Sequence, residues 1–461
     1  MSSPQTIVAL ATPAGRSGIG VIRLSGPAAV AYAQSLCSDG YDPRPRHALL
    51  KTLTDPNTGE PIDQAIITFF RAPHSFTGED VIEISCHGSP VLLRQVIDAC
   101  LGLGARMAEP GEFTMRALAN GRIDLTEAEA IRDLIEAQSA ASARQAVRQM
   151  TGELSRRLQP LKDQLLNVIV VLESAIEFVE DDLPTAQLDQ VAGSLVNIAA
   201  ETSRLADTFK AGHLIRDGLR VAIVGRPNVG KSSLFNTLLG SDRAIVTEVA
   251  GTTRDHLHER LLIDNIPISL IDTAGLRETH DMVESIGVER ARAVMADADL
   301  VVVMLDASEQ ISDEDRSILA AVSDLKIIVA FNKIDKAPSM DIDRIAAAGH
   351  AAYASLREKI LPMSVKTGEG IDDLRRAIVQ PFGSADTTVD GFLITDARHY
   401  DLLVRTAAEI HHAIEQLENR MSEEMVLVGL HNALRYLGEI TGETSTEDML
   451  TRIFSTFCIG K

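Results

Sequence analysis

The alternation of apolar and polar residues divides the chain into regions of different predicted structure. In residues 1 to about 122, short apolar runs stand close to glycine or proline, which is typical of strands in a small domain. Strands mixed with a helix over this length predict an α+β domain. We expect strands at 6–10, 19–25, 65–70 and 81–85, and a helix at 90–104.

From about residue 123, apolar residues recur every three to four positions, which predicts long helices with one buried face. Pro160 lies early in the longest run and marks either a kink or a helix start. The helical pattern continues to about residue 213 and returns from Asp396 to the end. The longest run consists of Leu154, Leu158, Leu161, Leu165, Ile169, Leu172, Ile176 and Val179.

Residues 219–383 alternate between strand and helix patterns. The simplest architecture is an α/β domain inserted into a helical domain, with the α+β domain in front. Four runs are apolar enough to be buried parallel strands, at 220–225, 268–273, 300–305 and 326–331. The predicted boundaries are 1–122 for the α+β domain, 123–217 and 384–461 for the two parts of the helical domain, and 218–383 for the α/β domain.

Composition narrows the possible classes of function. The net charge of −21 argues against a protein that wraps nucleic acid by bulk charge alone, although a local basic patch stays possible. No CxxC pair occurs among the cysteines, which fits a reducing, cytosolic compartment. No signal peptide pattern and no apolar run of about 18 residues is present, so we expect no membrane association.

A phosphate-binding loop follows the first strand of the α/β region. Gly225–Ser232 reads G-R-P-N-V-G-K-S and precedes a predicted helix. Its glycines allow backbone N–H groups to surround phosphates, Lys231 supplies a cation, and the Ser232 hydroxyl can bind Mg²⁺. The predicted nucleotide-binding residues here are Asn228, Val229, Gly230, Lys231, Ser232 and Ser233.

Further motifs at strand ends predict that the nucleotide is GTP. In D-T-A-G, the Asp272 carboxylate can hold Mg²⁺ through water and the Gly275 N–H can reach the γ-phosphate. In N-K-I-D, the Asp335 carboxylate can accept two hydrogen bonds from guanine, which adenine cannot donate. S-V-K follows a fifth strand and could close over the base. The residues of these motifs are Asp272, Thr273, Ala274, Gly275, Asn332, Lys333, Asp335, Ser364, Val365 and Lys366.

Between the first two motifs lies T-E-V-A-G-T-T-R-D, in the place of a switch loop. A threonine in such a loop contacts Mg²⁺ and the γ-phosphate, and orders the loop only in the triphosphate state. The predicted nucleotide-binding residues of this loop are Thr247, Glu248, Val249, Ala250, Gly251, Thr252 and Thr253.

Leu276 occupies the position where Ras-type GTPases have the glutamine that orients water. Either hydrolysis is slow, or another group acts, and carboxylates follow at Glu278, Asp281 and Glu284. Asn228 could help to coordinate a monovalent cation in place of an arginine finger, or it could be an ordinary turn residue.

The phosphate loop, the switch segment and the terminal F-C-I-G-K together resemble the MnmE (TrmE) family of tRNA-modification GTPases. The resemblance covers the whole chain and includes the motifs at 11–26, F-T-G-E-D-V-I-E-I-S-C-H-G at 76–88 and P-G-E-F-T-M-R-A-L-A-N-G-R-I-D-L at 110–125. It implies an α+β N-terminal domain for folate binding and dimerisation, and an all-α helical domain. A Ras-like α/β P-loop G domain is expected to be inserted into the helical domain.

The resemblance also implies a cytoplasmic homodimer with K⁺-stimulated GTP hydrolysis through dimerisation of the G domains. It implies a 5-formyltetrahydrofolate-type donor and an FAD-dependent partner, MnmG, in a heterotetramer or larger complex. Together they would add a carboxymethylaminomethyl or aminomethyl group at C5 of the wobble uridine of tRNA.

Carried onto this chain, the resemblance assigns Glu284 as the catalytic residue that orients or activates water. It makes Cys458 a functional cysteine near the folate, whereas the sequence alone equally allows a buried structural thiol. The family often has lysine where this chain has Arg122. The implied ligands are Asn228, Thr247, Val249 and Thr252 for K⁺, Ser232 and Thr253 for Mg²⁺, and Arg23, Glu83, Arg122 and Lys461 for folate.

The alternative function is that of a switch GTPase in ribosome assembly. The chain lacks a second G domain and an evident basic RNA-binding tail, and its N-terminal domain and C-I-G-K terminus favour tRNA modification.

Overall fold

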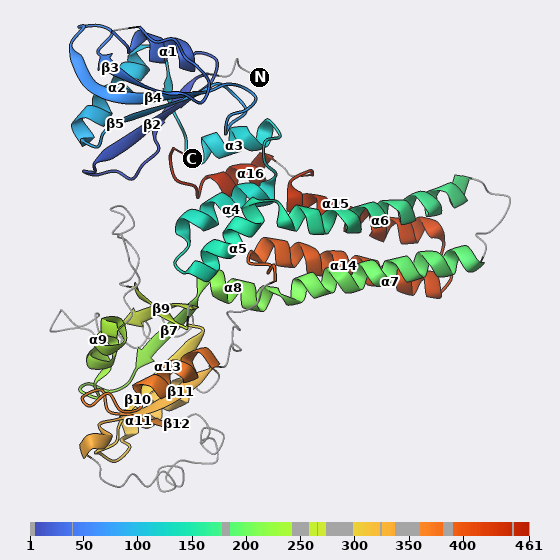
Figure 1. Cartoon of the computed structure of the whole chain (residues 1–461). Helices are drawn as coiled ribbons and strands as arrows, with labels where there is room; N and C mark the ends of the chain where they lie inside the picture. The colour runs from blue at the N-terminus through green and yellow to red at the C-terminus, as the bar shows by residue number, and fades with distance from the viewer. Residues whose placement is uncertain are drawn as a thin grey trace. The chain divides into compact units, whose positions relative to one another are not determined.

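The computed structural model describes residues 5–38, 40–177, 185–241, 258–264, 266–272, 298–322, 325–336, 360–380, 391–444 and 447–460. The chain forms two compact units (Figure 1). The first comprises Met1–Glu136, Ala146–Thr202 and Leu402–Lys461, and the second comprises Ala137–Gln145 and Ser203–Asp401.

The first unit contains a six-stranded sheet in the order β3-β4-β5-β2-β1-β6. Its pairs are antiparallel except for β1 with β6. The predicted strands and the helix at 90–104 are confirmed. The elements are β1 (Ile7–Leu10), β2 (Ile19–Ser25), α1 (Ala29–Ser35), β3 (Ala48–Thr54), β4 (Pro61–Phe70), β5 (Val81–His87), α2 (Pro90–Gly102) and β6 (Arg106–Met107).

Alternation along β2 and β5 decides which side chains reach the core of this sheet. Ile22 and Leu24 of β2 are fully buried in a cluster with residues of α1 and α2. Arg23 points to the opposite face, directly across from Glu83 of β5. Strand β3 was not predicted, because it lies at the edge of the sheet and buries only Leu53.

Long helices make up the rest of the first unit, as predicted, and α6 packs against α15. Leu154 through Leu172 of the predicted apolar run are buried, and Val179 lies outside the described residues. Pro160 lies inside α6, so a helix start at this residue is wrong. The helices of this unit are α3 (Glu112–Ala119), α4 (Leu125–Glu136), α6 (Glu153–Glu177), α15 (Glu423–Thr441) and α16 (Glu447–Phe454). Three further helices belong to it only in part, α5 (Ala140–Met150), α7 (Thr185–Asp207) and α14 (Ala397–Glu418).

The second unit contains a six-stranded sheet in the order β12-β11-β10-β7-β9-β8, parallel except for β8. The four predicted strands are confirmed, and β10 is buried at every position. Strand β8 was not predicted, because it lies at the edge and begins with three polar residues. The elements are α8 (Phe209–Asp217), β7 (Leu219–Val224), α9 (Lys231–Ser241), β8 (His258–Ile263), β9 (Ile266–Asp272), β10 (Leu300–Asp306), α11 (Asp313–Ala321), β11 (Ile327–Asn332), η1 (Ile334–Lys336), β12 (Ile360–Pro362) and α13 (Ile371–Val379).

A hydrogen bond and an ion pair join the segment before β7 to the segment after the α/β domain. The Ile394 N–H donates to the Thr208 hydroxyl at 3.0 Å, and Arg216 forms an ion pair with Asp396 at 2.7 Å. Burial would raise the pKa of Asp396, but the charges of His399 and Arg216 and hydrogen bonds hold it well below its usual value. The ionised carboxylate therefore stabilises this junction.

None of the helices described by the structure is long and apolar enough to cross a membrane.

We expect Asp396→Asn to lower the free energy of unfolding by about 1–3 kcal/mol at pH 7, because it weakens charge-assisted hydrogen bonds. The pKa of Asp396 is depressed by folding, so its contribution is complete above the unfolded value of about 4 and is lost as the pH falls towards the folded value. Urea denaturation should therefore show a difference between wild type and variant that shrinks below about pH 4. Equal stability at pH 7 would contradict this role.

Candidate functional site

The phosphate loop follows β7, a central strand whose carboxyl end lies between those of β10 and β9. Two of its glycines have positive φ, 151° at Gly225 and 107° at Gly230. A Cβ at Gly225 would lie 2.4 Å from the Met304 carbonyl oxygen, and one at Gly230 would lie 2.3 Å from Asn332 Nδ2. Only glycine allows the loop to lie this close to the ends of the neighbouring strands.

Lys231 begins α9 and its side chain turns back to the loop. Its Nζ donates to the carbonyl oxygens of Gly225 at 2.7 Å and Arg226 at 2.6 Å. Ser232 and Asn228 are exposed, and Asn228 has a φ of 65°. The first turn of α9 thus combines the backbone N–H groups of a helix N-terminus, an ammonium and an accessible hydroxyl, which is the composition of a phosphate and Mg²⁺ site.

Asn332 at the end of β11 connects the phosphate loop to the loop after β12. Its Nδ2 donates to the Val229 carbonyl oxygen at 2.7 Å, and its Oδ1 accepts from the Val365 N–H at 3.0 Å. The buried Ser364 donates its hydroxyl to the exposed Asp335 carboxylate at 2.7 Å. The structure thus brings together three predicted motifs that are far apart in the sequence, with Lys366 exposed beside them.

Asp306, at the end of β10, is a site residue that sequence reasoning missed. It forms an ion pair with Lys333 of the N-K-I-D motif. Burial would raise the pKa of Asp306, but hydrogen bonds from Lys333 and Ser308 hold it below its usual value. A carboxylate at the end of the strand next to N-K-I-D is the signal that could have identified it.

Part of the predicted site lies outside the described residues. Asp272 ends β9, at the same edge of the sheet as the phosphate loop. The predicted residues outside the described part of the chain are Thr247 through Thr253, Thr273, Ala274, Gly275, Glu284 and Lys461.

The first unit carries a second candidate site around Arg23. Its Nη2 and Nε contact Glu83 Oε1 at 2.7 and 3.0 Å, and its Nη1 donates to the Gly460 carbonyl oxygen at 3.3 Å. A Cβ at Gly460, where φ is 100°, would lie 2.3 Å from the Leu10 carbonyl oxygen. The glycine of C-I-G-K therefore allows the end of the chain to lie against β1 and Arg23.

The other predicted residues of this site have different surroundings. Arg122 lies against Gly78, since a Cβ there would be 3.2 Å from Arg122 Cγ. Cys458 is exposed, so the alternative of a buried structural thiol is wrong. Burial raises the pKa of the Cys86 and Cys100 thiols to about 12, which makes them unreactive.

Two family models match this chain. The model described as the MnmE helical domain matches residues 125–458, and the model described as the GTP-binding protein TrmE N-terminus matches residues 6–122. The chain belongs to the MnmE (TrmE) family of GTPases.

Similar proteins support membership of this family over the full length of the chain. A protein of Koribacter versatilis called tRNA modification GTPase MnmE is 45% identical over 100% of both chains. A protein of Aquifex aeolicus with the same name is 41% identical over 99% of this chain and 100% of its own.

Solved structures of other GTP-binding proteins resemble part of the chain. Era in complex with MgGDPNP and 16S ribosomal RNA nucleotides is 31% identical, with a TM-score of 0.29, over 41% of this chain and 66% of its own. The G domain of the T. maritima FeoB iron transporter is 28% identical, with a TM-score of 0.26, over 35% of this chain and 97% of its own.

Arg226 of this MnmE-family chain is held away from the role of an arginine finger. Its Nε donates to Asp315 Oδ1 at 2.8 Å, and its Nη2 donates to Glu309 Oε2 at 3.1 Å. Asp315 also forms the capping box of α11 with Ser312. The guanidinium therefore stabilises the contact between the phosphate loop and α11.

We expect Arg226→Met to change the turnover number for GTP by less than about threefold, because loss of an arginine finger would cost roughly 10³–10⁵. Release of inorganic phosphate at saturating GTP measures this. Lys231→Ala serves as the inactive control. A loss above about 100-fold with unchanged GTP affinity would show that Arg226 leaves Asp315 during the reaction.

Proposed function

We propose that this chain is a GTP hydrolase that acts in tRNA modification. With an FAD-dependent MnmG-type partner and a 5-formyltetrahydrofolate-type donor, it would add a carboxymethylaminomethyl or aminomethyl group at C5 of the wobble uridine. The observation that supports the proposal is two groups of contacts in one chain, one that joins the guanine-nucleotide motifs and one that joins Arg23, Glu83 and Gly460.

For the nucleotide, Lys231 binds the β- and γ-phosphate oxygens, and Asp335, oriented by Ser364, accepts from the guanine edge. The exposed Ser232 hydroxyl and Thr253 would hold Mg²⁺, which neutralises negative charge on the phosphates. Asp272 would contribute through water.

Because Arg226 is paired with two carboxylates, positive charge at the β–γ bridge has to come from elsewhere. We assign the K⁺ ligands as Asn228, which is exposed beside the phosphate loop, and Thr247, Val249 and Thr252 of the switch loop. Glu284 would orient the attacking water in place of the glutamine that Leu276 replaces. Association of two G domains in the homodimer would complete this arrangement.

In the N-terminal domain, Glu83 can accept from the amino edge of a pterin, while Arg23, Arg122 and Lys461 can meet folate carboxylates. Gly460, which precedes Lys461 in the sequence, accepts a hydrogen bond from Arg23. Cys458, exposed three residues before the end, would lie near the bound one-carbon group.

The proposed substrate is a cytoplasmic tRNA, and the net charge of −21 suggests that the MnmG-type partner supplies much of the tRNA contact.

The first test is mass spectrometry of wobble nucleosides from a strain that lacks this chain. We expect the modified uridines to disappear, to return with wild type, and to stay absent with Lys231→Ala or Arg23→Ala, because each removes one site. Arg94→Ala, which breaks only an exposed ion pair with Asp98, is the matched control and should restore modification. Normal nucleosides in the deletion strain, with co-sedimentation of the protein with ribosomal subunits, would instead favour ribosome assembly.

The second test concerns the cation. We expect faster GTP turnover in K⁺ than in Na⁺, with unchanged GTP affinity, because Lys231 and Mg²⁺ bind the triphosphate in both salts. Asn228→Ala should abolish the difference, whereas Glu284→Ala should lower kcat in both salts with little change in KM. Identical turnover of the wild type in K⁺ and Na⁺ would exclude the cation mechanism.

A further inference from the structure

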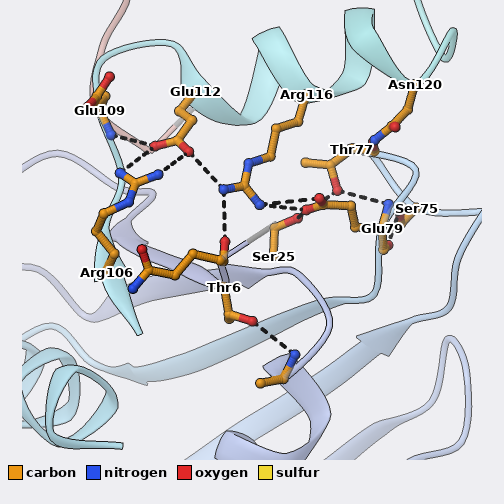
Figure 2. Close-up of polar contacts among 12 residues, drawn as sticks. Thr6, Ser25, Ser75, Thr77, Glu79, Arg106, Glu109, Glu112, Arg116 and Asn120 are labelled. Atoms are coloured by element: carbon orange, nitrogen blue, oxygen red, sulfur yellow. Dashed lines mark hydrogen bonds and ion pairs between the residues drawn. The ribbon is translucent and has the colours of Figure 1, made fainter. Parts of the chain in front are cut away.

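Two sequence motifs of the N-terminal domain have little part in the proposed function beyond Glu83 and Arg122. They are residues 76–88 and residues 110–125. In the structure, Glu79 of the first motif and Arg116 of the second motif point toward each other (Figure 2). These contacts suggest a shared role.

The centre of this group is Arg116 of α3. Its Nη1 donates to both Glu79 carboxylate oxygens, at 2.9 and 3.2 Å, and its Nη2 donates to Glu112 Oε1 at 2.8 Å (Figure 2). Nη2 also donates to the Gln5 carbonyl oxygen at 2.9 Å. The side chains of Arg116 and Glu112 are 13% and 6% exposed, so these bonds are shielded from water. We call Glu79, Arg116 and Glu112 the Arg116 bridge.

Other hydrogen bonds support the ends of the Arg116 bridge. Ser25 of β2 donates its hydroxyl to Glu79 Oε2 at 2.7 Å. Asn120, just after α3, donates to the Thr77 carbonyl oxygen at 2.7 Å. Arg106 binds Glu112 at 2.6 Å from the other side. The loop at 75–80 and helix α3 are thus joined at two points.

An aromatic residue lies close in sequence to each end of the bridge and contacts Arg23. Phe76 precedes Glu79 by three residues, and its ring centre is 5.7 Å from Arg23 Cζ. Phe113 directly follows Glu112, and its ring centre is 5.8 Å from the same atom. Both distances fall within the range of cation–π attraction. The two rings and Glu83 therefore fix the direction of the Arg23 guanidinium.

We propose that Arg116 is a positioning residue for the N-terminal ligand site. By joining Glu79 to Glu112, it holds Phe76 and Phe113 at the spacing that orients Arg23 toward an anionic, folate-type ligand. The position of Arg122 depends on the same loop at 75–80, because Arg122 lies against Gly78 of that loop. The inference rests on the proposed function, whose ligand class it adopts.

Calorimetry with 5-formyltetrahydrofolate and the full-length chain tests this. We expect Arg116→Met to weaken binding by about 10- to 100-fold, because Arg23 would lose the orientation in which it makes charge-assisted hydrogen bonds with the ligand. Arg116→Lys can still donate to one carboxylate and should recover part of the affinity. Arg94→Met is the matched control on an exposed ion pair and should bind as wild type does. GTP affinity, measured on each variant, should be unchanged.

A double-mutant cycle with Phe76→Leu separates positioning from general stability. If Arg116 acts through the ring, the losses of Arg116→Met and Phe76→Leu will be less than additive, since both remove the same constraint on Arg23. If Arg116→Met does not fold, Arg116→Lys and Glu79→Gln take its place in the cycle. Additive losses would show an independent structural role and overturn the inference.

The remaining outcomes distinguish this inference from the proposed function. Wild-type affinity for 5-formyltetrahydrofolate in Arg116→Met would overturn the role of Arg116 and leave the proposed function standing. Absence of binding by the wild type would overturn the proposed ligand, and the inference with it.

Discussion

The side-chain amide of Asn332 is the contact on which the described nucleotide site depends. It is 3% exposed, and its two polar atoms connect the phosphate loop with the loop that carries Ser364. An aspartate could not donate to the Val229 carbonyl oxygen, and an alanine would leave buried backbone groups unpaired. Gly230 is required by the same contact, since any side chain there would collide with Asn332.

In both units, ion pairs shielded from water also hold loops in position. Arg226 with Asp315, and Arg116 with Glu79, each join a loop to a neighbouring helix, and Glu112 of the same helix orients Arg116. Breaking one partner of such a pair is costly because it leaves the other charge poorly solvated. The pairs therefore favour a single arrangement of these loops, which is what a binding site needs before its ligand arrives.

Much of the α/β domain could be predicted from local pattern. Strands buried on both faces appear as continuous apolar runs, and β10 is buried throughout. Edge strand β3 escaped prediction because only Leu53 enters the core, and edge strand β8 because it begins with three polar residues, His258, Glu259 and Arg260. Pro160 lies inside α6, which excludes only the predicted alternative of a helix start.

The sequence by itself determined the guanine-nucleotide motifs, because each motif is a short run whose chemistry depends on adjacent residues. Only the tertiary structure decided which distant side chains meet. Asp306 pairs with Lys333, Arg226 with Asp315 89 residues away, and Arg23 with Gly460 437 residues away. Spacing cannot predict these pairs, because they follow from the order of strands in a sheet and from where the chain end packs. The contacts of Arg23 with aromatic rings, and the contacts of the Arg116 bridge, also could not be predicted from spacing.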